Sequence, residues 1–499
     1  MAFLNVYTAN KFVSENVFLS EIPENEELPL FKEIKQSLPQ PFWNENELAI
    51  ECYWKAWELA FNNLRKPTSE NGFITNYIDT AFNNLLFMWD SCFILLFAKY
   101  GNRVFNFQKT LDNLYSKQHK DGFISRVINE MNGQDRFHRF DPVSTGPNIL
   151  PFSEWEYYLN FGDKDRLKRV FPVLVGYHKW LREFRTWRDG SYWSSGWGCG
   201  MDNQPRLEKM YHVGFSHGHM VWSDTCFQQL LSAKLILSMS DEIGRRHEVP
   251  EFEEEIKYLS DFVNSTLWDE KSSYYYDLWK NNELNHVKSI GGYWALLADV
   301  VPESKKEGFI SHLTNEKEFN RPHPIPSLSA DHPEYREDAG YWRGGVWAPM
   351  NYMVLKGLSK SGYNALAHDI GVRHLEAVVK VYEDTGTLWE NYSAEKALPG
   401  VPAKPDFVGW TGLSPIAILF EYIFGLKPDV PNSKLEWDVR LLDAHGISQY
   451  PFGKEGILDL SCEGRKSTDE RPVIRATSNI PVTILVKWEK GKEYIELGK

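Results

Sequence analysis

H-K-D-G-F-I-S-R (119–126), W-R-D-G-S-Y-W-S-S (187–195), W-D-E-K-S-S-Y-Y-Y-D (268–277) and Y-E-D-T-G-T-L-W-E-N-Y (382–392) are four versions of one short pattern. Each has an acidic residue, then a turn of glycine or small residues, then aromatic residues. Such a pattern is typical of a hairpin at the end of a helix. Because it recurs at spacings of tens of residues, it predicts a repeat architecture of helical hairpins whose loops gather on one face.

The segments between these stretches have the periodicity of amphipathic helices. Residues 44–64 begin with asparagine caps and carry apolar side chains at three- and four-residue spacing, and residues 88–100 lead to a stop at Gly101. We expect a mainly α fold closed into an (α/α)6 barrel of the six-hairpin glycosidase type, because the loops are long, unequal and rich in tryptophan. The alternative is an open α-solenoid. Further helices are predicted at 104–118, 152–161, 165–184, 218–243, 252–267, 289–300, 304–313, 345–361, 363–382 and 411–424.

Changes of composition predict three parts of the chain. Residues 1–43 include the acidic, proline-containing text E-I-P-E-N-E-E-L-P-L and are expected to form an extended arm. Residues 44–426 are expected to form the barrel. Residues 427–499 alternate apolar and polar side chains in short runs, which predicts a small antiparallel β-domain.

Composition and charge exclude several classes of function. The net charge of −13, without a lysine and arginine cluster, argues against nucleic acid and anionic membranes as partners. Five scattered cysteines without a C-x-x-C pair favour a reducing compartment, and the first residues lack the pattern of a secretory signal, so a cytoplasmic protein is expected. The oligomeric state stays open, with a homo-oligomer as one option. Aromatic residues make up 15% of the chain, which favours a site where sugars stack over a merely aromatic core.

Two carboxylates on the repeated loops are the candidate catalytic pair. Asp202 lies in S-S-G-W-G-C-G-M-D-N-Q-P-R (194–206), where glycines leave the backbone free to approach a ligand, and Glu390 lies in the last repeat. Two acids with different surroundings can hold different pKa values, which is what the hydrolysis of a glycosidic bond requires. The alternatives are an Asp that bonds its own turn and a solvated loop Glu.

Three more motifs are candidate parts of a sugar site. Asp90, next to Trp89, can accept hydrogen bonds from sugar hydroxyls or cap its helix. Arg343 lies between tryptophans in D-A-G-Y-W-R-G-G-V-W (338–347). Trp410 lies between glycines. His217 and His219 have a spacing loosely like that of a metal site, but no third ligand is in register, so neither a metal nor another cofactor is expected.

These motifs resemble glycoside hydrolase family 63, in the order M-W-D-S, G-M-D-N-Q-P-R, Y-W-R-G-G-V-W, L-W-E-N-Y and F-V-G-W-T-G, over residues 45–425. The family includes processing α-glucosidases and mannosylglycerate and glucosylglycerate hydrolases, and trehalases carry a similar set. The resemblance implies an inverting hydrolase on an (α/α)6 barrel, with Asp202 as general acid and Glu390 as general base. It implies that the cleaved sugar is lined by residues of the same motifs, namely Trp89, Asp90, Asn203, Arg206, Tyr341, Trp342, Arg343, Trp347 and Trp410.

Two stretches differ from the family pattern. S-S-G-W-G-C-G before Asp202 lacks the acid of the more usual E-S-G, and S-A-E-K-A-L-P-G (393–400) replaces the usual P-x-T-G. Both flank the leaving-group side. The resemblance therefore implies a short α-glucoside or α-mannoside, such as a disaccharide, an oligosaccharide or a glycosylglycerate, as substrate. A trehalase-like enzyme and an inactive sugar-binding protein are the alternatives.

Overall fold

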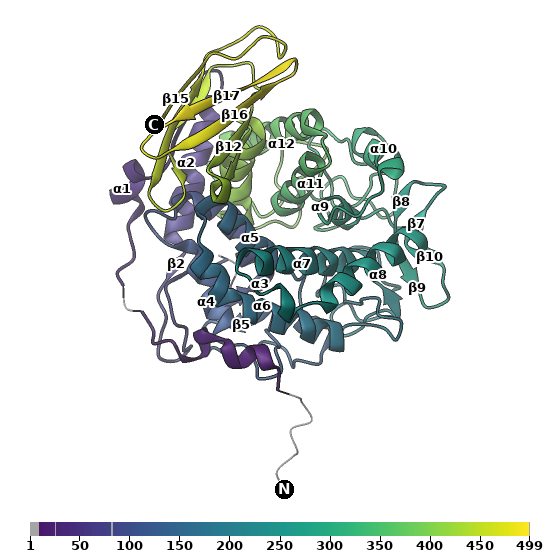
Figure 1. The fold of residues 1–499 in the computed structure, drawn as a ribbon. Helices are drawn as coiled ribbons and strands as arrows, with labels where there is room; N and C mark the ends of the chain where they lie inside the picture. Colours follow the sequence, from purple (N-terminus) through teal and green to yellow (C-terminus); the bar gives the residue numbers. More distant parts are fainter. Residues whose placement is uncertain (1–8, 25, 81–82, 499) are drawn as a thin grey trace.

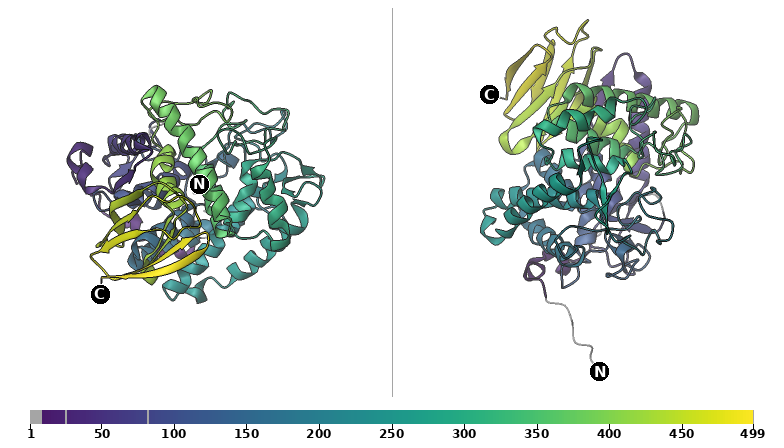
Figure 2. Two further views of the ribbon diagram at one scale, coloured as in Figure 1. Left: turned by 90° about the horizontal axis from the view of Figure 1, so that it is seen from above. Right: turned by 90° about the vertical axis from the view of Figure 1, so that its right-hand side faces the viewer.

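The computed structural model describes residues 9–24, 26–80 and 83–498 and has helices at its centre with β-sheets at one end (Figure 1). The C-terminal sheets lie at one pole of the molecule, and the segment that follows the N-terminus lies at the other (Figures 1 and 2). No helix among these residues is both long and apolar enough to cross a membrane. All five cysteines are buried free thiols.

Six helical segments form a closed inner series. Each contacts the next, and the last contacts the first. Every residue of the first and the last is buried, because they are packed on all sides. The series is α3 (Met88–Ala98), α5 (Leu150–Phe161), α7 (Ser223–Glu242), η8 with α9 (Ile290–Tyr293 and Trp294–Leu297), α11 (Ala348–Lys360), and η10 with the π-helical η11 (Trp410–Leu413 and Ser414–Ile423).

Six further helices alternate with these along the chain. The short α4 is buried throughout, whereas the other five keep an exposed face: in α8 the buried residues are Phe252, Glu255, Leu259 and Val263, which form a single stripe. The polar residues of the other face lie toward solvent. The set is α2 (Glu47–Asn62), α4 (Thr110–Tyr115), α6 (Lys164–Phe184), α8 (Glu251–Thr266), α10 (Glu303–Ser311) and α12 (Asn364–Thr385).

Most predicted helices are found near their predicted bounds, and three differ. The helix predicted at 218–243 begins at Ser223, because Gly218 and His219 have positive φ angles that end any regular helix. The one predicted at 104–118 contains only η5 (Phe107–Lys109) and α4. The one at 289–300 is a short 3-10 turn followed by α9. Shorter 3-10 turns are η4 (Lys99–Gly101), η6 (Pro142–Ser144), η7 (Arg246–Glu248), η9 (His312–Thr314) and η12 (Val430–Asn432).

The repeated loop stretches form hairpins to different degrees. The third forms a real one, with β7 (Trp268–Asp269) paired to β8 (Tyr274–Tyr275), whereas the second makes a single bridge, from Tyr192 to Thr186. The fourth bridges to residues outside the stretch, with Trp389 opposite Pro405 and Tyr392 opposite Val346 and Pro399. The first forms only a turn, with backbone hydrogen bonds from His119 N to Phe123 O and from Gly122 N to His119 O. The other loop strands are β2 (Leu64–Arg65) with β3 (Tyr77–Ile78), β4 (Leu85–Phe87) with β5 (Val127–Asn129), and β6 (Met220–Val221), β9 (Asp277–Trp279) and β10 (Leu284–Asn285).

The C-terminal region folds into two four-stranded sheets. Their strands alternate buried and more exposed side chains, as the sequence pattern predicts. The pairing is antiparallel except between β12 and β16, which run parallel, so the expectation of a purely antiparallel domain is corrected. One sheet has the order β11 (Leu426–Asp429), β12 (Lys434–Asp438), β16 (Val482–Trp488), β17 (Gly491–Leu497). The other has the order β1 (Gln40–Trp43), β13 (His445–Phe452), β14 (Gly456–Cys462), β15 (Ile474–Ser478).

The N-terminal arm is more structured than expected. It contains η1 (Lys11–Glu15), η2 (Val17–Ser20), α1 (Phe31–Ile34) and η3 (Lys35–Ser37), and it ends in β1 of the C-terminal sheet. Phe12 and Phe18 are buried, and the Asn16 side chain donates to Tyr115 O at 3.0 Å. Burial of these rings holds the arm against the helices, so the part of the arm that the structure describes is packed on the protein and is not extended.

Candidate active site

The loop that carries Asp202 packs closely on the protein itself. Gly200 has φ +82° and lies against the Trp89 ring, where an added Cβ would come within 3.1 Å of the indole, and a Cβ on Gly196 would lie 2.4 Å from the Val213 side chain. These glycines therefore let the backbone bend and approach neighbouring residues. The expectation that they mainly clear space for a ligand is corrected by these contacts.

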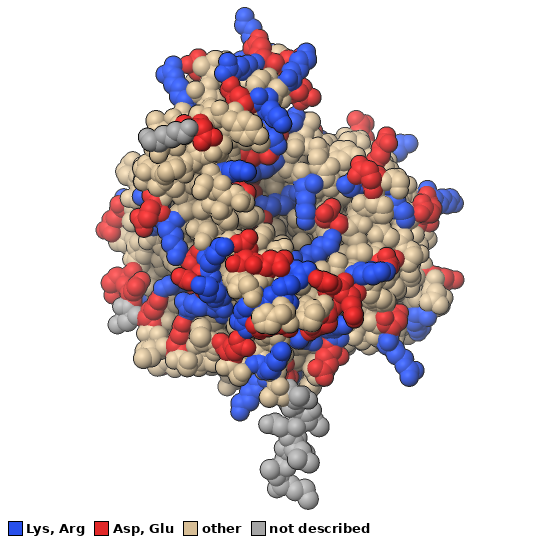
Figure 3. All heavy atoms as spheres, viewed as in Figure 1, with Lys and Arg blue, Asp and Glu red and all other residues tan. Residues whose placement is uncertain are grey.

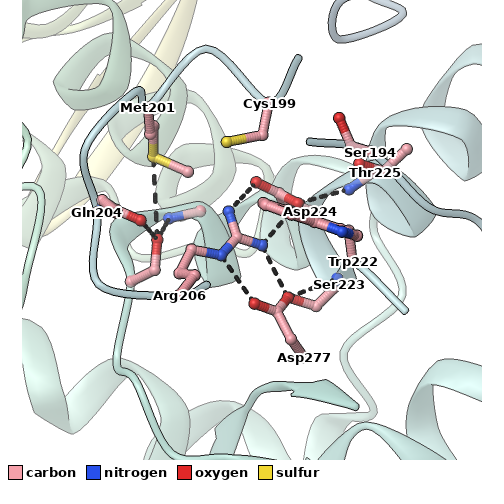
Figure 4. A network of polar contacts seen from close by, with 12 residues as sticks. Ser194, Cys199, Met201, Gln204, Arg206, Trp222, Ser223, Asp224, Thr225 and Asp277 are labelled. Carbon is pink, nitrogen blue, oxygen red and sulfur yellow. Dashed lines mark hydrogen bonds and ion pairs between the residues drawn. The ribbon is translucent and has the colours of Figure 1, made fainter. Parts of the chain in front are cut away.

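The far end of the same loop is fixed by Arg206. Its guanidinium binds both oxygens of Asp224, at 2.6 and 2.9 Å, and both oxygens of Asp277, at 2.8 and 2.7 Å (Figure 4). It lies over the Trp222 ring and is only 2% exposed. Because its donors are used in this way, Arg206 connects the loop to α7 and β9. The prediction that it contacts the sugar does not agree with this geometry.

Asn203 and Arg343 connect the Asp202 loop to the segment 338–347. The Asn203 side chain donates to Gly340 O and accepts from Trp342 N, each at 2.9 Å. Arg343 Nε donates to Asn203 O at 3.1 Å, and its Nη1 lies 3.1 Å from Glu334. Both residues were predicted to bind substrate, and in the structure both hold two loops together. Their hydrogen bonds fix the position of Tyr341 relative to Asp202.

Glu390 is buried and held from two sides. The Tyr341 hydroxyl donates to Oε1 at 2.8 Å, and the backbone N–H of Lys404 donates to Oε2 at 3.1 Å. Burial raises the pKa of Glu390, these two hydrogen bonds lower it, and the charge of Asp202 raises it again. Both donors favour the ionised carboxylate, so they suit a group that accepts a proton from water.

Asp202 has different surroundings. It is half-buried, and burial raises its pKa to about 6 against the opposing effect of Arg126. Asp90, in the first turn of α3, is 7% exposed, and burial raises its pKa to about 8. The charges of Asp202, Glu390 and Arg126 all act on Asp90, which places the predicted acids in one site. At neutral pH Asp90 is therefore mostly protonated and able to donate a hydrogen bond.

Tryptophans form the wall behind these acids. The Trp342 and Trp347 rings stack on each other at 3.9 Å, and Trp410 meets Trp347 edge-on at 5.6 Å. Trp410 Nε1 donates to Glu390 O at 3.3 Å. Trp342 and Trp347 are fully buried, so the prediction that they line the sugar is replaced by a supporting role behind Tyr341. Trp89 is also buried, and its Nε1 has no hydrogen-bond partner among the described residues.

Arg126 is a site residue that the sequence analysis did not identify. Among the residues that the structure describes, it is the only cation whose charge lowers the pKa of both Asp90 and Asp202. Its Nε donates to Val143 O at 2.7 Å. The repeated pattern could have pointed to Arg126. The first repeated stretch ends at this arginine, just as the last repeated stretch ends two residues after Glu390.

His217 packs on Trp187 and Trp193, and the described residues contain no group of three or more side chains able to hold a metal.

Residues 84–400 match a family model described as mannosylglycerate hydrolase MGH1-like glycoside hydrolase domain. The chain belongs to this family. It is therefore a glycosidase, and the match covers Asp90, Arg126, Asp202 and Glu390. The family confirms the resemblance seen in the motifs.

Four relatives of this MGH1-like glycosidase cover between 49% and 80% of it. An uncharacterised protein of Borreliella burgdorferi is 24% identical over 80% of this chain and 84% of its own. The mannosylglycerate hydrolase of Thermus thermophilus is 22% identical over 56% of this chain and 83% of its own. The chain spans about a third (34%) of the length of the mannosyl-oligosaccharide glucosidases that it matches in Schizosaccharomyces pombe and Saccharomyces cerevisiae.

Solved structures show the same fold. The GH63 mannosylglycerate hydrolase of Thermus thermophilus in complex with glucose superposes with a TM-score of 0.59 at 20% identity, over 74% of this chain and 99% of that one. Neutral trehalase Nth1 of Saccharomyces cerevisiae gives 0.57 at 14% identity, over 69% and 73%. The MGH1-like glycosidase thus shares its fold with enzymes that act on different sugars.

Proposed function

We propose that the protein is an inverting α-glycosidase with Asp202 as general acid and Glu390 as general base. The observation that carries the proposal is the contrast between the two carboxyl groups. Burial raises the pKa of both groups, to about 6 for Asp202, but the hydrogen bonds that Glu390 accepts from Tyr341 and Lys404 N lower its pKa and favour its ionised form. A protonated acid and an ionised base at one site are the minimum that this hydrolysis needs.

The proton transfers balance. Glu390 takes a proton from water as the water oxygen bonds to the anomeric carbon, and Asp202 gives its proton to the glycosidic oxygen as the bond to that carbon breaks. The products are a free sugar with inverted anomeric configuration and an alcohol. Asp90, which is neutral at pH 7, donates a hydrogen bond to a sugar hydroxyl, and Arg126 limits the rise in the pKa of Asp202.

We also assign the fold as an (α/α)6 barrel over residues 44–426, with residues 427–499 as a C-terminal β-domain. The closed series of inner helices and their alternation with amphipathic outer helices support this assignment. Asp90 lies at the start of an inner helix, and Asp202 and Glu390 lie on loops between helices, so one end of the barrel carries the site.

As substrate we propose a short α-mannoside or α-glucoside, with the glycosylglycerates first. The family model and the Thermus thermophilus relative both carry the name mannosylglycerate hydrolase. A panel of mannosylglycerate, glucosylglycerate, trehalose and aryl α-glycosides, read by the sugar released, tests the class. Proton NMR of the anomer first formed tests inversion. Release of the retained anomer, or of no sugar from any member, would contradict the proposal.

A glycosyl fluoride separates the two roles. Fluoride leaves with little need for a proton, so Asp202→Asn should keep activity on the matching α-glycosyl fluoride while it loses about 10²–10⁴-fold on the natural glycoside. Glu390→Gln should lose activity on both, since water still needs a base. Asp90→Asn is the comparison variant, because Asp90 has the more strongly raised pKa. If Asp90→Asn alone were rescued by the fluoride, Asp90 would be the acid.

A further inference from the structure

A cavity of about 430 Å³ lies at the end of the helices opposite to Asp202 and Glu390. Helix α11 begins after Trp347 in the wall behind the acids and ends at Lys360 in the cavity, and α3 runs in the same direction from Asp90 to Lys99. Figure 3 shows this face hollowed below the C-terminal sheets, with lysine and arginine side chains in the hollow. The cavity is therefore separate from the catalytic site.

The wall on the helix side is largely apolar. Phe152 and Trp155 come from α5, and Leu231 and Leu235 come from α7. The volume lies in the range of small-molecule sites, which span about 300–1,000 Å³, and charged residues complete the lining. Neutral hydrogen-bonding side chains also line the cavity, namely Asn160, Ser359 and Asn364.

Two of the lysines are balanced by acids. Lys99 Nζ lies 3.0 Å from Glu421 and 3.7 Å from Glu156, and Lys356 contacts the same two carboxylates. Glu421 also accepts from the Tyr352 hydroxyl at 2.7 Å. This cluster has equal numbers of positive and negative groups, so by itself it needs no ligand.

The remaining lysines are in excess. Lys427 and Lys487, from strands β11 and β16, share one carboxylate, Glu436. Lys360 has no carboxylate within ion-pairing distance among the described residues. Its ammonium donates to the Leu297 carbonyl at 3.1 Å, and the residue as a whole is exposed. The cavity thus carries more positive than negative side chains in a chain whose net charge is −13.

Capping of helix ends accounts for only part of this excess. Lysines bind the free carbonyls at the carboxyl end of a helix, as Lys360 binds Leu297 O after α9. Lys427 and Lys487 belong to strands, however, and the Lys427 ammonium is directed at Ser359 Oγ and Asn364 Oδ1. Burial lowers the pKa of Lys427, the charges of Glu436 and Asp438 raise it, and the charges of Lys356 and Lys487 lower it again. A bound anion would offset that repulsion.

We propose that this cavity binds a phosphomonoester with a small apolar body, with Lys360, Lys427 and Lys487 around the phosphate and Trp155 against the apolar part. Phosphate carries the charge that two excess lysines can neutralise, and a mobile ammonium suits it as a point charge. The C-terminal sheet supplies two of the three lysines, which gives this sheet a role in ligand binding. The site is independent of the proposed glycosidase reaction.

Phenyl phosphate is the probe, and titration calorimetry of the full chain at constant ionic strength is the measurement. We expect saturable binding that is at least about tenfold tighter than that of inorganic phosphate, because the ring covers the apolar wall. Lys360→Met and Lys427→Met should each weaken it about tenfold. Lys257→Met, on the exposed face of α8, is the matched control and should leave it unchanged. Asp202→Asn should also bind normally, which separates this cavity from the catalytic site.

Two outcomes would overturn the proposal. One is an affinity that the cavity variants leave unchanged, which would place the anion elsewhere. The other is equal binding of phenyl phosphate and inorganic phosphate, which would indicate an adventitious ion only. Chemical acetylation of lysines in the protein without substitutions is a measurement that no folding defect of a variant can affect. Phenyl phosphate should protect Lys360 and Lys427 from acetylation and leave Lys257 reactive. Equal labelling with and without the probe would count against the site.

Discussion

At the scale of single residues, the chemistry depends on which groups contact each carboxylate. Tyr341 and the Lys404 N–H hold the ionised form of Glu390, and Asp202 has the Arg126 charge near it. A base must be ionised, so activity rises with pH through the pKa of Glu390. An acid must be protonated, so activity falls as pH rises through the pKa of Asp202, about 6. The expected profile of kcat/KM is a bell on the acidic side of neutral.

Tyr341→Phe should move the acidic limb of that profile to higher pH. The variant removes a hydrogen bond that lowers the pKa of Glu390, so less of the base is ionised at a given pH. A hydrogen bond to a charged group is worth about 1.5–3 kcal/mol, which corresponds to a roughly 10- to 150-fold loss of kcat/KM on that limb. The measurement is kcat/KM against pH. Tyr335→Phe is the control, since this hydroxyl bonds Glu395 instead; an acidic limb that moves equally in both variants would refute the role of Tyr341.

Arg126→Met should move the basic limb to higher pH. The guanidinium lowers the pKa of Asp202, so its loss leaves Asp202 protonated over a wider range. Activity relative to the optimum should then increase above pH 7. Arg126→Lys keeps the positive charge and should keep the limb in place. A basic limb at the same pH in Arg126→Met and the unchanged enzyme would show that Asp202 does not set it.

At the scale of elements, the loop 194–206 is positioned by a buried ion network. Arg206 joins it to Asp224 at the start of α7 and to Asp277 at the start of β9. Asp277 also accepts from Ser223 N and Oγ, each at 2.9 Å. The loop has no regular structure of its own around Asp202, so these contacts decide where its carboxyl group lies.

Arg206→Met should destabilise the protein by about 3–5 kcal/mol, because it leaves two buried carboxylates without their counter-ion. The same variant should lower kcat more than it raises KM, since the displaced group is the acid and the Arg206 guanidinium is bound by Asp224 and Asp277. Urea denaturation and steady-state kinetics are the measurements. Lys257→Met, which breaks the exposed pair with Asp261, is the control and should change neither quantity. A rise in KM alone would indicate that Arg206 binds substrate.

At the scale of the whole molecule, the first strand joins the two ends of the chain. β1 immediately precedes α2 and pairs with β13 in the C-terminal region. Trp43 at its end is buried, donates to Asp443 at 2.8 Å and meets the Phe424 ring edge-on at 6.5 Å. The helices and the C-terminal sheets are therefore expected to unfold together.

Trp43→Ala should shift one common thermal transition to lower temperature, with a loss of about 3–5 kcal/mol for a buried aromatic side chain. Phe42→Ala is the matched control, because Phe42 lies on the other face of the same strand and is 40% exposed. Differential scanning calorimetry is the measurement. Two separate transitions in the unchanged protein, of which Trp43→Ala moves only one, would contradict coupling of the two regions.

The sequence by itself determined the periodic features. Helices such as 165–184 and 363–382 were predictable to within a few residues, because a one-sided apolar stripe needs only the helical period. The motifs around Asp202 and Glu390 were visible for the same local reason, and so was the alternation of the C-terminal strands.

Only the tertiary structure decided what each motif residue contacts. Arg206 and Asn203 lie beside Asp202 in the sequence, yet their partners Asp277 and Gly340 are far along the chain. The pairing of β1 with β13 and the lysine-lined cavity likewise bring together residues hundreds of positions apart. Hydrogen bonds and charges act over a few ångströms in space, so the sequence order of a polar residue does not say which group it will meet.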